Sequence, residues 1–198
     1  MVGAIVSSLG GPAARAGESP APQRGWVPTA SLAIGSFDER LRVRVDGTDY
    51  NSYRGQLRTL FALGLAHPVA RLPYEHMWID GHGSLGAGLT FDTGHWQLPV
   101  REDLTVAFAA ARWLTLRTGL GVGLTIDASA GDRSFGELAL PISLTFFRTL
   151  ELVYRPMLSI PLGSETSPVL GGEREISTRL MVLPFELLLR VRIGALAW

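Results

Sequence analysis

Residues 113–126, with the sequence WLTLRTGLGVGLTI, decide the fold because they carry two different faces on alternate positions. The even positions are mostly apolar, as at Leu116, Leu120 and Leu124, whereas the odd positions hold small or polar residues such as Arg117 and Gly121. Successive side chains of a β-strand point to opposite faces, so the pattern predicts a strand with one apolar and one polar face. The run is much longer than the usual strand of about five or six residues. Such length is typical of a transmembrane β-barrel, in which lipid meets the apolar face and the interior meets the polar face.

The composition fits a barrel wall and excludes several other classes of protein. Of the 198 residues, 46% are hydrophobic and 18% are charged, yet no run approaches the roughly 18 apolar residues of a membrane helix. The formal net charge of zero argues against nucleic-acid binding through a basic field. The absence of cysteine excludes a disulfide framework and thiol chemistry.

The same alternation recurs along the chain between turn signals, and the connections alternate between short and long. Tight turns are expected at 111–113 and 148–149, and polar loops at 92–101 and 163–173, while 37–53 reads as a loop or a hairpin extension. This asymmetry is typical of outer-membrane barrels, which have short periplasmic turns and longer external loops. Eight strands are expected, at about 26–36, 54–66, 74–90, 102–111, 113–127, 134–147, 149–161 and 175–198.

The last of these segments leaves the strand count open between eight and ten. At 183–185 the apolar positions change from even to odd numbers, which indicates either a β-bulge or a turn between two strands. A turn there would need a further strand, for which 41–45 is the candidate, to keep the even count of bacterial barrels. The fold class is therefore an all-β, antiparallel, up-and-down transmembrane β-barrel, with eight strands favoured over ten.

A soluble barrel of the lipocalin type is the structural alternative, because its strands alternate too, with the apolar face inside. Its exterior would then have to be rich in charge. On the strand at 113–126 that face would offer one Arg, three Gly and two Thr and no acidic residue, which favours the membrane barrel.

The N-terminus has features of a processed segment. A short apolar stretch at 2–9 is followed by the sequence Ala-Arg-Ala at 14–16, an A-x-A pattern of the kind cleaved after export. We therefore expect residues 1–16 to be the remnant of an export signal, 17–25 a flexible lead-in with two prolines, and 26–198 the barrel.

The C-terminal sequence RVRIGALAW at 190–198 resembles the end of bacterial outer-membrane β-barrel proteins. In that family the last strand typically ends in an aromatic residue that the assembly machinery reads, and Leu196 and Trp198 match its hydrophobic-x-aromatic ending. The resemblance covers roughly 26–198 and implies an outer-membrane location, contact with outer-membrane lipids and assembly by the barrel-assembly machinery. It is a resemblance of architecture, which implies no particular activity.

The polar faces of the expected strands together carry many charged side chains. An eight-stranded barrel has an interior that side chains just fill, and buried charges must be paired there. We therefore expect a salt-bridged plug, with a narrow Arg-lined pore for small solutes as the alternative. The expected network is Arg58, His76, Asp80, His82, Asp103, Arg117, Glu137, Glu151, Arg155, Arg179, Arg190 and Arg192.

One pair of residues could carry chemistry. His82 and Ser84 lie on the same face of a strand and resemble the His-x-Ser pair of outer-membrane lipid A deacylases, in which an acidic residue orients the imidazole; Asp80 and Glu102 are near in sequence. The residues that follow, Leu85 and Gly86, depart from the Ser-Asn-Ala of that family, and strand parity directs both side chains into the lumen rather than toward acyl chains. A lipid A-modifying hydrolase is thus the minor alternative.

No metal site or cofactor is expected. His76, Asp80 and His82 are possible ligands by type, but the spacing places His76 about 13 Å from Asp80 along a strand, too far for one ion. The sequence favours a non-enzymatic outer-membrane barrel that acts as an envelope anchor, a scaffold or a partner-binding component of a cell-envelope assembly.

Overall fold

The computed structural model describes residues 25–45, 48–91, 94–128, 134–162, 165–169 and 172–193. The expected export-signal remnant, the lead-in up to residue 24 and the C-terminal Leu196 and Trp198 lie outside these ranges. In the described ranges there is no helix long and apolar enough to cross a membrane.

The described part of the chain is built from β-strands. They are β1 (Val27–Val45), β2 (Thr48–Arg71), β3 (Met77–Thr90), β4 (Trp96–Ala111), β5 (Leu114–Asp127), β6 (Ser134–Ala139), β7 (Ile142–Phe146), β8 (Leu150–Tyr154), β9 (Met157–Pro161), β10 (Glu165–Val169) and β11 (Gly172–Arg192).

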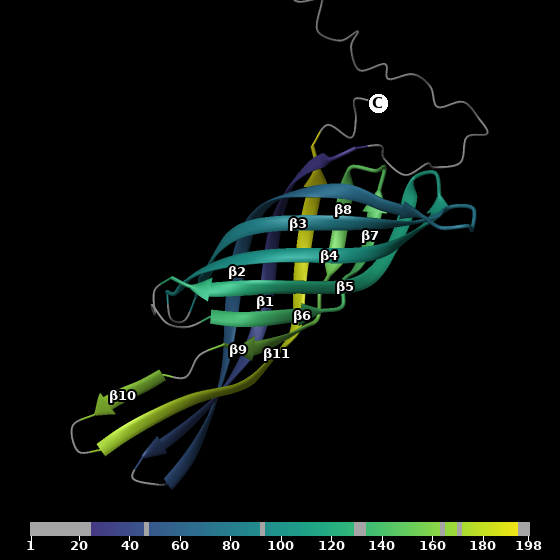
Figure 1. Cartoon of the computed structure of the whole chain (residues 1–198). Coiled ribbons are helices and arrows are strands. Elements are labelled where there is room, and N and C mark those ends of the chain that lie inside the picture. Colours follow the sequence, from purple (N-terminus) through teal and green to yellow (C-terminus); the bar gives the residue numbers. More distant parts are fainter. Residues whose placement is uncertain are drawn as a thin grey trace, which may run out of the picture.

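The strands close into one antiparallel barrel (Figure 1). Neighbours in sequence pair as hairpins, and β1 pairs with β11 to complete the ring. β6 and β7 form one interrupted wall strand, and β8 and β9 form another, because both halves pair with the same neighbours. The wall built from the described residues therefore has eight strands, which confirms the preferred count. The candidate extra strand at 41–45 is part of β1.

The two interruptions occur at prolines, which have no backbone N–H to donate to a neighbouring strand. Pro141 separates β6 from β7, and Pro156 separates β8 from β9. Both carbonyls still accept a hydrogen bond across the wall, Pro141 O from Gly119 N at 3.2 Å and Pro156 O from Leu140 N at 3.0 Å. The prolines thus break the regular ladder without opening the barrel.

The register of the strands sets their tilt. Following paired residues around the wall from Val27 leads to Leu183 on β11 and returns to β1 between Ser36 and Asp38. One full circuit of the wall therefore shifts the strand register by about ten residues. For eight strands, this shift corresponds to a tilt of the strands of about 40° from the barrel axis. A barrel of this size encloses only enough space for side chains.

The parity change at 183–185 is a bulge. Ser36 faces Phe185 whereas Asp38 faces Val182, so β11 contains one residue more than β1 between these pairs. After this irregularity Glu186, Leu188 and Arg190 are buried, and the odd-numbered residues between them are exposed. The extra residue resets which face of β11 points inward.

Two expected loops are more ordered than the sequence indicated, and at 37–53 the structure shows the second of the two expected alternatives. Of the expected loop at 92–101, residues 96–101 belong to β4, because Gln97 and Arg101 point into the barrel and owe their polarity to the interior. In the expected loop at 163–173, β10 pairs with β11 as a hairpin. The segment 37–53 is a hairpin extension of β1 and β2 rather than a loop.

These extensions reach beyond the wall at one end of the molecule (Figure 1). The ladder between β1 and β2 continues to Val45 and Thr48, and the ladder between β1 and β11 continues to Arg44 and Glu175. With β10 added at the edge of β11, the extension is a four-stranded sheet in the order β2–β1–β11–β10.

The outer surface of the wall is apolar. On β5, Leu116, Leu120 and Leu124 are exposed while Arg117 is buried, as the alternation predicts. The other wall strands repeat this arrangement with exposed Leu, Ile, Val and Phe side chains. This exterior suits contact with lipid.

Candidate functional site: the ionic interior of the barrel

The interior of the barrel holds a balanced set of buried charges. Among the described residues, six arginines and six carboxylates are each at most 8% exposed, so their formal charges cancel. They are Arg58, Asp80, Arg101, Asp103, Arg117, Asp127, Glu137, Glu151, Arg155, Glu186, Arg190 and Arg192. A buried charge is tolerated when it is paired and hydrogen-bonded, so the geometry of the pairs decides whether this interior is stable.

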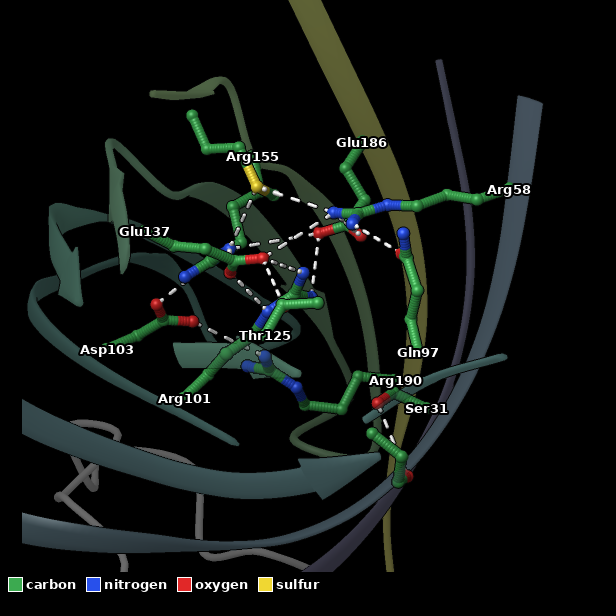
Figure 2. A network of polar contacts seen from close by, with 12 residues as sticks. Ser31, Arg58, Gln97, Arg101, Asp103, Thr125, Glu137, Arg155, Glu186 and Arg190 are labelled. Atoms are coloured by element: carbon green, nitrogen blue, oxygen red, sulfur yellow. Dashed lines mark hydrogen bonds and ion pairs between the residues drawn. The ribbon is translucent and has the colours of Figure 1, made fainter. Parts of the chain in front are cut away.

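Glu137 on β6 is the centre of the first cluster (Figure 2). Its two oxygens accept hydrogen bonds from Arg101 Nε at 2.7 Å and Arg101 Nη2 at 3.1 Å, so this pair is bidentate. Thr125 Oγ1 donates to the same carboxylate at 2.6 Å, and Arg155 Nη1 lies 3.3 Å from it. Charge-assisted bidentate pairs of this kind are the strong ones, so Glu137 holds Arg101 of β4 firmly and also contacts Arg155 at the break between β8 and β9.

Glu186 on β11 extends this cluster to the opposite wall (Figure 2). It accepts from Arg101 Nη1 at 2.9 Å and from Arg58 Nη2 at 3.1 Å. Arg58 also donates to Gln97 Oε1 at 3.2 Å. Side chains from β2, β4, β6 and β11 therefore meet across the barrel at one level.

A second cluster surrounds Glu151 on β8. Arg190 Nη1 lies 3.3 Å and Arg192 Nη2 lies 3.4 Å from one carboxylate oxygen, while Ser143 Oγ donates to the other at 2.6 Å. Nearby, Arg117 Nε donates to Asp80 Oδ2 at 3.2 Å, and Arg117 also donates to the hydroxyl of Thr145.

Asp103 on β4 connects the two clusters. One of its oxygens lies 3.2 Å from Arg155 Nε in the first cluster, and the other lies 3.8 Å from Arg190 Nη2 in the second. The charges thus form one continuous network along the barrel axis rather than two separate sites.

The network leaves little space. A cavity of about 10 Å³ lies between the clusters, lined by Ser84, Arg155 and Arg190 among others. A second cavity of about 30 Å³ lies at the end with the short turns, beside Trp78, Arg117 and Arg192. A single water needs roughly 10–15 Å³, so these spaces hold about one or two waters. In the described part of the barrel the arrangement is a plug of ion pairs and not a channel.

The structure places most residues of the expected network inside the barrel. Arg58, Asp80, His82, Asp103, Arg117, Glu137, Glu151, Arg155, Arg190 and Arg192 are all buried there. His76 is a correction: it lies on the exposed turn before β3, with a positive φ of 70°, because the strand begins at Met77. Arg179 lies on β11, but its side chain is outside the described set.

Three of the buried charged residues were not expected from the sequence. The polar run at 92–101 indicates a loop, although Arg101 at its end shares the parity of Asp103 on the same strand. Glu186 has the parity of Arg190 and Arg192, but it follows the bulge at 183–185, which made its face ambiguous. Asp127 continues the inward face of Arg117 along β5.

The pair His82 and Ser84 does not form a catalytic arrangement in the described structure. His82 is buried, and its Nε2 is 2.9 Å from Thr29 Oγ1 rather than bonded to Ser84 or to a carboxylate. Ser84 lines the small internal cavity. Both residues therefore face the plug and not the lipid. Among the described residues, no group of three or more His, Asp or Glu side chains is arranged to hold a metal ion.

A closed antiparallel barrel with an apolar exterior and an ionic interior defines a class: this is a small transmembrane β-barrel. The expected fold, the architecture of small bacterial outer-membrane barrels, is confirmed.

Searches for similar proteins found no matching family model and no matching curated protein. Among solved structures, the chain is similar to Ail, the attachment invasion locus protein of Yersinia pestis, in two crystal structures. For Ail in complex with the heparin analogue sucrose octasulfate, the identity is 14%, the TM-score is 0.25, and 80% of this chain and 98% of Ail are covered. For Ail alone, the identity is 14%, the TM-score is 0.19, and the coverage is 83% and 99%. The fold assignment rests on the strand register and the exposure pattern of this chain.

Proposed function

We propose that this protein is a non-enzymatic outer-membrane barrel that anchors a partner-binding sheet at the cell surface. The observation that carries the proposal is the filled interior, in which six arginines and six carboxylates leave cavities of only about 10 and 30 Å³. A barrel that is plugged in this way contributes a stable wall and a fixed orientation. Leu196 and Trp198 would be read by the barrel-assembly machinery during insertion.

The plugged interior separates an anchor from a pore, which is tested by conductance. Purified protein in planar bilayers should show no conductance steps above the lipid background. Reproducible single-channel steps from the wild-type barrel would contradict the anchor and favour the pore. Glu137→Ala and Glu186→Ala serve as control variants in the conductance measurement. Each removes a carboxylate that holds the plug together and leaves a cavity in its place.

The partner-binding part of the proposal rests on the sheet that extends past the wall (Figure 1). In the described structure the ladder between β2 and β3 ends at Arg58 and Thr90, with one further bond from Phe91 N to Leu57 O at 2.9 Å. From Thr48 to Gln56, β2 pairs with β1 alone among the described residues, so its outer backbone groups form an open edge. An open strand edge is a template for another extended segment, which adds as a further strand through main-chain hydrogen bonds.

A shortened hairpin tests this surface. Ser36 and Leu57 are paired, so a two-residue Asn-Gly turn between them removes the extension of β1 and β2 while the wall is kept. The control is Asp46→Asn, which leaves the extension in place. Proteins that co-purify with the wild type and the control from detergent-solubilised outer membranes should be lost from the shortened variant, while both variants keep the gel mobility of a folded barrel. Equal recovery of the same proteins with all three would refute the role of the extension.

A further inference from the structure

A large open hollow lies on the outside of the wall, where the barrel meets lipid. It is an open groove of about 990 Å³ across β2, β3, β4 and β5. Its apolar rim consists of Leu63, Leu65, Leu85, Val100, Val122 and Leu124, and it also contains Trp26, His67 and Glu102. A carboxylate and an imidazole on an otherwise apolar outer face are unusual enough to need a physical reason.

The two polar side chains lie flat against the wall because the strand beneath them carries glycines. The ring of His67 lies over Gly81, where a Cβ atom would collide with it. Glu102 Oε2 lies over Gly83, 2.7 Å from where a Cβ would be. The tips of the side chains meet over β3, with His67 Nε2 3.2 Å from Glu102 Oε1. The ring of Trp26 covers His67, with ring centroids 4.7 Å apart.

Glu102 lies within the apolar belt rather than at its edge. Its neighbours on the outer face of β4 are Val100 and Leu104, which are exposed, and Trp96 and Phe108 lie further along on either side. A charged side chain at such a depth is costly unless a partner group compensates it. The Glu102 side chain is 48% exposed, and the hydrogen bond that the described structure gives it, with His67 Nε2, is made by Oε1. Lipid headgroups lie at the interfaces, so at this depth another protein wall is the source of any further donor to this carboxylate.

We propose that the groove binds a second copy of this chain, with the N–H of each His67 that meets Glu102 of its own chain shared with Glu102 of the other copy. The donor and acceptor atoms are 3.2 Å apart and therefore lie at nearly the same depth. Two copies inserted in the same orientation are related by a twofold axis along the membrane normal, which preserves depth. If this axis passes in front of Gly83, His67 of each copy faces Glu102 of the other. The same surface then contacts itself, as in every twofold interface.

The glycines of β3 beneath the polar pair and the Leu and Val side chains around the groove suit this contact. Gly81 and Gly83 let the side chains of His67 and Glu102 lie close against the wall, and Leu85 of one copy meets the hollow of the other. Small residues at an interface within the membrane allow this kind of close packing. The dimer also removes the exposed carboxylate from lipid. The inference rests on the membrane location proposed above.

Cross-linking in the membrane tests the contact directly, because the chain has no native cysteine. Leu85→Cys lies in the groove, beside the expected axis, and should form a disulfide-linked homodimer in isolated membranes. Leu152→Cys is the matched control, since Leu152 is also an exposed leucine of the outer face and lies on β8, across the barrel. Strong cross-linking at Leu152, or none at Leu85 in a folded, membrane-fractionated protein, would overturn the dimer. Recovery of Leu85→Cys in the soluble fraction would instead refute the membrane location itself.

A complementation experiment isolates the polar pair. His67→Leu and Glu102→Leu, each in the Leu85→Cys background, should each reduce the homodimer about tenfold through loss of the charge-assisted contact. When the two variants carry different tags and are made together, one His67–Glu102 contact is restored and the mixed dimer should return. Wild-type cross-linking by either variant alone, or no mixed dimer, would refute the assignment. A lipid occupant would give the second outcome.

Discussion

The bidentate pair between Arg101 and Glu137 offers the strictest test of the plugged interior. Arg101→Leu and Glu137→Leu each leave one uncompensated charge among buried groups. Glu137→Leu removes the acceptor of two Arg101 bonds, at 2.7 and 3.1 Å, and the 3.3 Å contact of Arg155. Removing one partner of a buried pair typically costs about 3–5 kcal/mol, and we expect each single variant to be destabilised by that amount.

The double variant should be far less destabilised than the sum of the two. The interior then holds five arginines and five carboxylates from the described set of six and six, so the charges balance again. Glu186 keeps Arg58 at 3.1 Å, and Arg155 keeps Asp103 at 3.2 Å. We therefore expect a cost close to that of one single variant and a coupling energy of about 3 kcal/mol.

The measurement is urea-induced unfolding in lipid vesicles, followed by the fluorescence of the five tryptophans. Leu138→Val is the control, because Leu138 follows Glu137 on β6 but faces outward, and it should change the free energy of unfolding by less than about 0.5 kcal/mol. Single variants that cost less than about 1 kcal/mol, or costs that add in the double variant, would show that the plug does not stabilise the barrel through this pair.

Three further predictions follow from the wall, the terminus and the His-x-Ser pair. Leu120→Arg places a charge on the lipid face of β5 and should destabilise the barrel by about 2–4 kcal/mol in the same vesicle assay; equal stability would argue against lipid contact there. Deletion of Trp198 should lower the amount of folded barrel in the outer membrane without changing synthesis or export, measured by pulse-chase and gel mobility, and normal levels would reject its role in assembly. Ser84→Ala should leave the mass spectrum of the cell's lipid A unchanged, because Ser84 lines an internal cavity, whereas a Ser84-dependent loss of acyl chains would establish a hydrolase.

The wall of the barrel could be predicted from sequence because its physical requirement is periodic. Alternation at 113–126 reflects one face in contact with lipid and one with the interior, and β5 spans almost the same residues. The interruptions at Pro141 and Pro156 did not disturb the prediction, because each broken wall strand stays in register with the wall strand that precedes it.

The interior was harder to predict because a polar residue in the sequence can belong either to a loop or to an inward-facing position of a strand. Polar residues at 96–101 look like a loop in sequence, whereas in the structure Gln97 and Arg101 are polar because they face the plug. The alternation of β3 predicted an inward-facing His76, but the strand begins one residue later, at Met77. No periodic signal indicates which acid meets which arginine, because those distances depend on the stagger of all eight strands.

The groove on the outer wall was not anticipated at all. His67 stands before a proline in sequence, and Glu102 was considered only as a possible acid near His82. Their contact joins residues 35 positions apart across an intervening strand. Only the register of β2, β3 and β4 brings them together.

The seam between β1 and β11 has a consequence for how the barrel forms. The other neighbours in the wall follow one another along the chain and can pair as soon as they are made, but Thr29 and Arg192 come together only when nearly the whole chain exists. Because this step closes so long a loop, most of the chain entropy that the barrel topology costs is lost in it. Such non-local pairing is slow. Until that step the growing sheet has two exposed edges, which invite pairing with other chains. The seam is also one of the longest ladders in the molecule, running from Thr29 to Arg44 past the rim of the wall. The part of this ladder outside the wall can therefore align β1 and β11 before their membrane-embedded parts pair. This shortens the time for which the two sheet edges remain unpaired.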